Sequence, residues 1–471
     1  MASLFRRDPD PAEEDPIRGK MSGQYHCRSN RMGRAVKPAA LVLMLGAALS
    51  LASAQDDVLT LEAAIQMALT RNEQSLAADQ TYTAARARVT EARAFFLPAI
   101  NAVGTYTRRP FQVVREFQGS TIAIQKYNAL QGVISLNLIV FDSQTIPGYK
   151  NARAQERAQR LASADAKRQL AFEVSNAFIL TLGVDRILEA ARHRYDYAKQ
   201  AYDAAKARYS AGLVGVNDVT RAQLEVATAE RSITQAQGSA QTTYLQLGYL
   251  LDEQDLIKRK LQVPDSLITA AADQVFPGEG LVEEAQNRRL DLNSLRWQAQ
   301  AQKALALTPT LRWFPSLALT GQYRYTNEAG LTGRNTNWNV GATMGWSIFD
   351  GFSRNGQHSE YKALAELAEL DVRASLRQVD LQVREALVSL ENQRAVFKQA
   401  GVAYDVALKN AAEISELYRQ GLASALQVAD ANVALFEAEV TLVRERYGVG
   451  ISYLNLEAAL GLDPMGKEPV L

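Results

Sequence analysis

The sequence predicts a mainly α-helical protein with membrane-crossing β-strands, built from two tandem copies of a unit that holds one long helical hairpin and two strands. Three observations predict this fold class. One pattern of residues occurs twice, long proline-free segments show helical spacing, and four short segments alternate between apolar and polar residues. A duplicated unit of this length indicates one elongated body of two related halves rather than several unrelated domains.

The duplication is a set of residues that recurs without a gap after a constant 209 positions. Upstream of it, Pro98 and Tyr106 recur as Pro315 and Tyr323 at a similar separation. The residues with the constant separation are Tyr209, Gly212, Leu213, Val219, Ala222, Ala229, Glu230, Tyr244, Leu245 and Leu247, which recur as Tyr418, Gly421, Leu422, Val428, Ala431, Ala438, Glu439, Tyr453, Leu454 and Leu456. Function is therefore expected in what two such units build together.

The amino-terminal part predicts export. Basic residues precede an apolar run at 39–51, and an Ala-x-Ala site precedes Gln55, so residues 32–54 form a predicted signal peptide. A membrane anchor is the weaker alternative, because a run of this length is shorter than the roughly 20 residues that span a bilayer. Residues 1–31 are expected to be a non-native or untranslated extension, with Met21 or Met32 as the true start.

Composition excludes several classes of function. The chain has 52 basic and 51 acidic residues, so nothing indicates nucleic acid as a partner. Its only cysteine, Cys27, precedes the predicted cleavage site, which leaves the exported chain without a thiol. The exported chain keeps only His193 and His358, far apart, and neither a P-loop nor a G-x-S-x-G motif. We therefore expect no enzyme activity, no cofactor and no metal site.

The first element expected is a helix over residues 59–95. This segment is rich in alanine and free of proline, and Leu61 and Ile65 show helical spacing. Thr60 is a suitable residue to begin it, since threonine is favoured at a helix N-cap. At Pro98 the spacing changes to a period of two.

Four strands are expected, near residues 98–108, 129–141, 315–326 and 337–349. Their length of about ten residues crosses a bilayer when the strands are tilted. Each has one apolar set of side chains and an opposite set that keeps polar residues. Ordinary surface hairpins are the alternative. If the strands form a membrane barrel, several chains must share it, because single-chain barrels start at about eight strands.

Each copy of the unit also predicts a long helical hairpin. The descending arm of the first, from about Gly148 to Ser210, would be on the order of 90 Å long at 1.5 Å per residue. Gly212 and Gly215 interrupt the first helical run, and Gly421 interrupts the second. Helices of this length are typical of coiled-coil packing.

The chain resembles the TolC-like outer-membrane efflux proteins over nearly all of its exported part. The residues that carry the resemblance are Leu61–Ala68, the strand starts at Phe96–Pro98 and Phe314–Pro315, the Phe-Asp pairs at Phe141 and Phe349, the tips at Tyr209–Leu213 and Tyr418–Leu422, and the closing Leu456, Ala459, Leu460, Gly461 and Asp463. The resemblance implies a homotrimer with a 12-strand barrel in the outer membrane of a Gram-negative bacterium and an α-helical tunnel in the periplasm. It also implies docking to a periplasmic adaptor and an inner-membrane transporter.

In that family the hairpin tips converge on a periplasmic aperture held shut by polar links. The matching positions here are Asp218 and Tyr418, an inter-hairpin pair, and Asp430, an acidic residue of the inner wall. The sequence departs from the family at Gln427, where a further acid is expected, and at Ala423, where a basic residue is expected. For Asp218 the alternative is a helix N-cap, and for Tyr418 it is ordinary packing within the hairpin.

The exposed tips of the two hairpins are expected to contact the adaptor. They consist of Gly212, Leu213 and Val214 in the first hairpin, and Gly421, Leu422 and Ala423 in the second. Small apolar side chains there would permit tip-to-tip packing of helices. The two glycines would also serve as ordinary turn residues that end a helix.

These features predict an outer-membrane channel that works as the exit duct of an efflux or secretion system. The repeats are expected at residues 55–262 and 281–463, joined by a linker at 263–280 and followed by a tail at 464–471. A periplasmic coiled-coil adaptor, or a structural protein of an export complex, is the alternative; an adaptor would have a single hairpin.

Overall fold

The computed structural model describes residues 58–117, 119–278, 280–329 and 333–469. They belong to one compact unit that spans Asp56–Leu471. The predicted signal peptide and the extension before it lie outside the described residues, so their boundaries stay predictions. The predicted repeat and linker boundaries also stay predictions.

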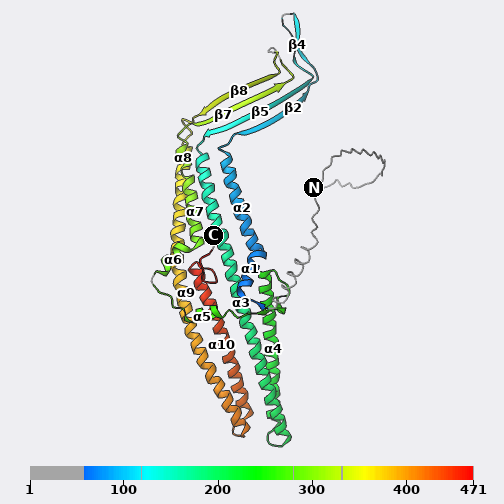
Figure 1. Cartoon of the computed structure of the whole chain (residues 1–471), viewed down its shortest axis with the longest axis vertical. Helices are drawn as coiled ribbons and strands as arrows, with labels where there is room; N and C mark the ends of the chain where they lie inside the picture. The colour runs from blue at the N-terminus through cyan, green and yellow to red at the C-terminus, as the bar shows by residue number, and fades with distance from the viewer. Residues whose placement is uncertain (1–57, 118, 279, 330–332, 470–471) are drawn as a thin grey trace, which may run out of the picture. The chain divides into compact units, whose positions relative to one another are not determined.

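Long antiparallel helices and a four-stranded sheet make up most of the unit (Figure 1). The helices are α1 (Leu61–Arg71), α2 (Glu73–Ala94), α3 (Thr145–Ser210), α4 (Val216–Leu251), α5 (Asp265–Asp273), α6 (Leu281–Arg288), α7 (Leu290–Leu305), α8 (Thr308–Leu311), α9 (Ser353–Arg419) and α10 (Ala425–Ala459), with a 3-10 turn at Leu256–Lys258. The strands are β1 (Val58–Leu59), β2 (Ala99–Arg108), β3 (Val113–Phe117), β4 (Ser120–Gln125), β5 (Asn128–Phe141), β6 (Lys260–Leu261), β7 (Ser316–Thr326) and β8 (Thr336–Gly345).

Both predicted helical hairpins are confirmed. The first consists of α3 and α4 and the second of α9 and α10, and the partners in each hairpin pack along their length. Helix α3 has 66 residues and begins three residues before the predicted Gly148. Pro147 does not prevent the earlier start, because proline is tolerated in the first turn, where its missing N–H would be unpaired anyway.

The single helix predicted over residues 59–95 is two helices that meet at Asn72. This residue has an extended backbone, with φ −66° and ψ 134°, and its side chain accepts a hydrogen bond from the Gln74 amide to begin α2. The side-chain Nδ2 of Asn72 also donates to the carbonyl of Leu250 over 3.1 Å. The break therefore depends on a contact with α4, which helical spacing alone does not reveal. The predicted start at Thr60 is confirmed, since its hydroxyl accepts from the Ala63 amide over 3.2 Å.

The main sheet has the antiparallel order β2-β5-β7-β8. Its register confirms the predicted separation of polar and apolar side chains. One row across the four strands is Ala102, Ile134, Tyr323 and Trp338, and the adjacent row on the other face is Asn101, Ser135, Gln322 and Asn339. Because side chains alternate along a strand, one face of this sheet is apolar and the other largely polar.

Two details of the strands were not predicted. The segment between the first two predicted strands contains the additional hairpin of β3 and β4. The fourth strand ends at Gly345 rather than at 349, because its last partner is Ser316, the first residue of β7. Pro315, which precedes Ser316, has no N–H to extend the ladder.

The largest apolar core lies where α1, α5, α6 and the middle of α3 meet the ends of α4 and α10. Phe178 of α3 is fully buried there, as are Leu247 and Leu456, which are equivalent residues of the two copies. The copies also end alike: Asp252 after α4 has φ +53° and its equivalent Gly461 after α10 has φ +77°. Among the described residues, no helix combines the length and the apolar character needed to cross a bilayer.

Candidate functional site at the hairpin tips

The two hairpin tips have the same backbone turn. After α3, Gly212 has φ +68° and the amide of Leu213 donates to the carbonyl of Arg208. After α9, Gly421 has φ +80° and the amide of Leu422 donates to the carbonyl of Leu417. This is the pattern in which a left-handed glycine ends a helix. The predicted turn role of both glycines is confirmed.

The residues expected to contact an adaptor are at the solvent-accessible ends of both hairpins. Leu213 is 74% exposed and Leu422 is 73% exposed, although both are large and apolar. Val214 and Ala423 beside them are half-buried. Each tip thus presents one exposed leucine that has the same position in both copies.

Arg208 joins the two tips within one chain. Its guanidinium comes from α3 and donates to the carbonyl of Tyr418 over 2.8 Å and to the carbonyl of Arg419 over 2.9 Å. The same guanidinium lies over the Tyr418 ring, 4.4 Å from the ring centroid. The last carbonyls of a helix carry partial negative charge and lack partners within the helix. Arg208 therefore caps the carboxyl end of α9 from the other hairpin.

The side chain of Tyr418 is buried, with 7% of its surface exposed. Its hydroxyl has no hydrogen-bond partner among the described residues. A buried unpaired hydroxyl costs free energy, and because this one is covered by the chain itself, a partner from another chain could reach it only after a rearrangement of the tip. Within one chain no hydrogen bond joins Tyr418 to Asp218, and the pairing of these two residues stays a prediction.

Asp218 and Gln427 are equivalent residues of the two copies, and each is the third residue of its helix. The N-cap of α4 is Gly215, so the suggestion that Asp218 caps the helix with its side chain is wrong. Asp218 lies in the first turn, where its charge favours the positive end of the helix. Gln427 instead completes a capping box with Ser424, whose amide donates to Oε1 of Gln427 over 2.8 Å.

Asp430 lies one turn beyond Gln427 on α10, and its side chain is exposed. Ala423, where the family pattern predicts a basic residue, leaves no cation at that position.

Arg208 was not predicted from the sequence, although it places a cation at the same tip. A comparison of the two repeats could have revealed Arg208. The equivalent residue in the second repeat is Leu417, whereas the next position is tyrosine in both repeats, as Tyr209 and Tyr418.

Charged pairs inside the hairpins account for several helical polar residues. Arg194 of α3 donates to Glu225 of α4 over 2.6 Å, and its guanidinium lies over the ring of Phe436. Burial raises the pKa of the Glu439 carboxyl group. The Nδ1 atom of His193 lies 3.9 Å from Oε1 of Glu439.

In the part of the chain that the structure describes, no group of histidine and acidic residues could hold a metal ion.

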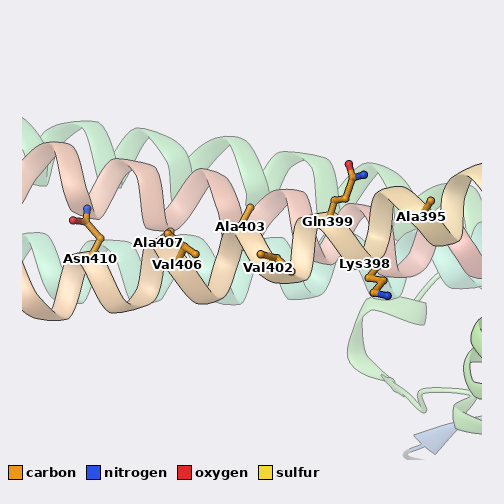
Figure 2. Close-up of a pocket in the computed structure, with 8 residues that line it drawn as sticks. All are labelled: Ala395, Lys398, Gln399, Val402, Ala403, Val406, Ala407 and Asn410. Atoms are coloured by element: carbon orange, nitrogen blue, oxygen red, sulfur yellow. The ribbon is translucent and has the colours of Figure 1, made fainter.

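One face of α9 is an exposed stripe of small and apolar residues. It lines a groove of about 820 Å³ and runs from Ala395 to Asn410 (Figure 2). Val402 and Val406 at its centre are 61% and 62% exposed. Lys398, Gln399 and Asn410 supply its polar groups. Such a stripe on a long helix is the type of surface that packs against another helix.

The chain has two long hairpins with exposed apolar ends, and a short amphipathic sheet at the opposite ends of their helices. These features define a class of channel-forming membrane proteins. The chain belongs to the outer membrane efflux protein family, whose model matches residues 64–252 and 281–462. The prediction of an outer-membrane efflux channel, made from the duplicated motifs, is confirmed, and nothing supports the alternative of a periplasmic adaptor.

Two relatives are similar to the chain in sequence. The chain is 24% identical over 384 residues to the outer membrane protein TolC of Vibrio cholerae, which covers 79% of this chain and 84% of that protein. It is 23% identical over 159 residues to the nodulation protein T of Rhizobium leguminosarum bv. trifolii, with 33% of this chain and 34% of the relative covered.

Solved structures show the same fold. Similar ones include CusC, with a TM-score of 0.74 and 18% identity over 85% of this chain and 92% of that one. The outer membrane protein VceC of Vibrio cholerae has a TM-score of 0.71 and 17% identity, over 86% and 96% of the two chains. The MtrE channel of Neisseria gonorrhoeae, solved in an open state, has a TM-score of 0.68 and 16% identity, over 87% and 91%.

Proposed function

We propose that three copies of the chain form the exit duct of an export system, with a shared β-barrel in the outer membrane and a helical tunnel below it. The observation that carries this proposal is the open sheet. In the order β2-β5-β7-β8, the outer strands β2 and β8 each lack a partner on one side among the described residues. Lipid does not tolerate unpaired strand edges, so β8 of one copy must pair with β2 of the next.

The direction of the strands agrees with this closure. The four strands alternate in direction, so β8 and the β2 of a neighbouring copy would run antiparallel. Three copies give an even number of strands, as bacterial barrels have. The apolar row with Ile134 and Trp338 would face lipid, and the polar row with Asn101 and Asn339 would face the lumen.

The exposed stripe on α9 supports the same assembly (Figure 2). In a closed ring of helices this face would pack against a helix of the adjacent copy. Removing Val402 and Val406 from water would contribute to association, at about 25 cal/mol for each Å² of apolar surface.

We further propose that the exposed tips dock to a periplasmic adaptor and that an inner-membrane transporter supplies the energy. The tips provide Leu213 and Leu422 as apolar contacts. Around the tips, Asp218 of one chain and Tyr418 of the adjacent chain would close a periplasmic aperture. Asp430 would line this aperture. The position of Asp218 in the first turn of α4 and of Tyr418 at the end of α9 supports this link.

Light scattering of the channel in mild detergent tests the assembly. We expect a particle that contains three chains and that conducts ions in planar bilayers. A monodisperse, folded monomer would contradict the shared barrel and the pore. Substitution of Val340 by Pro on the edge strand β8 should abolish assembly, whereas a change in the β3–β4 hairpin, Val114→Ala, should leave the trimer intact.

A further inference from the structure

A cavity of about 550 Å³ lies between α3 and α7, near the ends of these helices that adjoin the sheet. Helix α3 begins at Thr145, just after β5 ends at Phe141, and α7 ends at Leu305, shortly before β7. Of the described residues that line this cavity, four are basic and none is acidic; the basic ones are Lys150, Arg153, Arg157 and Lys303.

Among the described residues, three of these basic groups have no carboxylate partner. Lys303 has one, since it forms an ion pair with Glu369 at 2.6 Å. The Arg157 guanidinium lies over the ring of Trp297, 4.5 Å from its centroid. Within the described residues, Lys150 and Arg153 have neither an ion pair nor a hydrogen-bond partner, and both side chains are exposed. The cavity therefore has an excess of positive charge.

The cavity is apolar at the end nearer the sheet. Ile146 and Tyr149 of α3 and Leu307 after α7 line this end, and the Tyr149 ring meets Phe96 edge to face at 5.7 Å. Lys150 and Arg153 follow Ile146 by about 6 and 10 Å along the helix axis. The polar layer on each side of a bilayer is roughly 5 to 8 Å thick. The apolar end thus lies toward the membrane and the basic groups lie at headgroup level or just below it.

The cavity opens on the side of α3 that, farther along the helix, is covered by α1 and the carboxy-terminal segment. Ile146, Lys150, Arg153 and Arg157 form one row with alternating spacings of four and three. The row continues in Arg160, Ala164 and Lys167, which line a cavity beneath α1 and the carboxy-terminal segment. A spacing of 3.5 residues keeps such a row on one face of packed helices. Because the lumen of a duct must stay open, a face covered by added segments points outward.

We propose that this cavity binds an anionic glycerophospholipid of the periplasmic leaflet of the outer membrane. Its phosphate contacts Lys150, Arg153 and Arg157, and its acyl chains leave past Ile146 and Leu307. The inference rests on the proposed function, because the position of the membrane follows from the strands. A zwitterionic lipid binds less well, since its ammonium group would lie among the same cations.

Native mass spectrometry of the assembled channel tests the proposal. The channel, in mild detergent, is titrated with short-chain phosphatidylglycerol, with phosphatidylcholine of the same chain length, and with inorganic phosphate. The cavity variant is Lys150→Gln, Arg153→Gln, Arg157→Gln. The matched control, Arg192→Gln, Lys199→Gln, Lys206→Gln, removes the same number of charges from the far part of α3, where all three residues are exposed.

We expect the wild-type channel to prefer phosphatidylglycerol to phosphatidylcholine, and inorganic phosphate not to displace the lipid. Each basic residue near a membrane surface contributes roughly a fivefold gain in affinity. The cavity variant should therefore bind phosphatidylglycerol at least about tenfold more weakly, and the control should bind it like wild type. Equal binding of the two lipids, or an unchanged cavity variant, overturns the proposal.

Displacement by inorganic phosphate also overturns the proposal, because it assigns the site to a soluble anion. If the triple variant does not assemble, Lys150→Gln alone, expected to lose roughly fivefold, provides the same comparison. Failure of the lipid proposal is distinguishable from failure of the proposed function. A channel that is trimeric and conducts ions, but does not discriminate between the lipids, contradicts only the former.

Discussion

The guanidinium of Arg208 lies 4.4 Å from the ring centroid of Tyr418 and donates a hydrogen bond to the carbonyl of that residue over 2.8 Å. The two residues belong to different copies of the duplicated unit, at the ends of α3 and α9. One side chain thus fixes the tip of one hairpin relative to the other. It also occupies one face of the Tyr418 ring, whose hydroxyl has no partner in the part of the chain that the structure describes.

Arg208→Ala should separate the two tips of a chain. Spin labels at Leu213→Cys and Leu422→Cys, measured by pulsed electron paramagnetic resonance, should show a longer and broader distance distribution than in the labelled parent. Hydrogen bonds to a charged donor contribute about 1.5 to 3 kcal/mol when buried, and less at this half-buried site.

Arg419→Ala is the matched control for this change. The Arg419 side chain pairs with Glu416 on its own helix, whereas Arg208 contacts only the Arg419 carbonyl. The control should leave the distances between the two labels unchanged. Arg208→Lys should give distances between those of Arg208→Ala and those of the labelled parent. Identical distributions in Arg208→Ala and the parent would show that the tips are held by other contacts.

Tyr418→Phe combined with Asp218→Ala should raise the single-channel conductance in planar bilayers. The Tyr418 hydroxyl has no partner among the described residues of its own chain, so its removal does not cost that part of the chain a hydrogen bond. A loss would arise only where an Asp218 of a neighbouring copy accepts from it, at roughly 1.5 to 3 kcal/mol for each link. Unchanged conductance, with the trimer and the circular dichroism spectrum intact, would mean that Tyr418 only packs within the hairpin.

Asp430→Asn should reduce the preference of the channel for cations without widening the aperture. The side chain is exposed, and Gln427 one turn earlier is neutral and engaged in a capping box. Reversal potentials in a salt gradient measure this preference, and the effect should weaken as ionic strength rises. The exposed Asp255→Asn serves as a control remote from the tips. Equal reversal potentials for Asp430→Asn and wild type would place Asp430 outside the conduction path.

Glu457 should make stability fall as the pH rises. Burial, with a smaller contribution from the charge of Asp463, raises the pKa of Glu457 to about 7 from 4.5. Its side chain is buried and Oε2 has no partner among the described residues. The folded state therefore holds the proton more tightly than the unfolded state. The stabilisation is fully present below pH 4.5 and is lost between pH 4.5 and 7.

Glu457→Gln should flatten this pH dependence, because the amide keeps the shape and stays neutral. At pH 8 the variant should gain on the order of 3 kcal/mol, the value of the shift in pKa. Thermal unfolding between pH 5 and 8 measures the change, with Glu230→Gln, exposed on α4, as the control. A wild-type unfolding midpoint that does not vary with pH would contradict this prediction. So would a Glu457→Gln midpoint that varies with pH as steeply as that of the wild type.

The sequence by itself determined the duplication, the two hairpins and the separation of the sheet into an apolar and a polar face. These features depend on periodicity: a period near 3.6 marks a helical face, and a period of two marks the faces of a strand. The turn glycines Gly212 and Gly421 were predictable for a related reason, because a left-handed residue that ends a helix is usually glycine.

Only the tertiary structure decided where these elements stop and which distant residues meet. The break at Asn72 depends on its contact with Leu250, and the end of β8 depends on where its partner β7 begins. The link from Arg208 to Tyr418 and the basic cavity around Arg153 join segments far apart in the chain. The first has no local period. The basic residues of the cavity are regularly spaced on α3, but that spacing does not reveal that α7 lies opposite, because such contacts are set by how the long helices pack against one another.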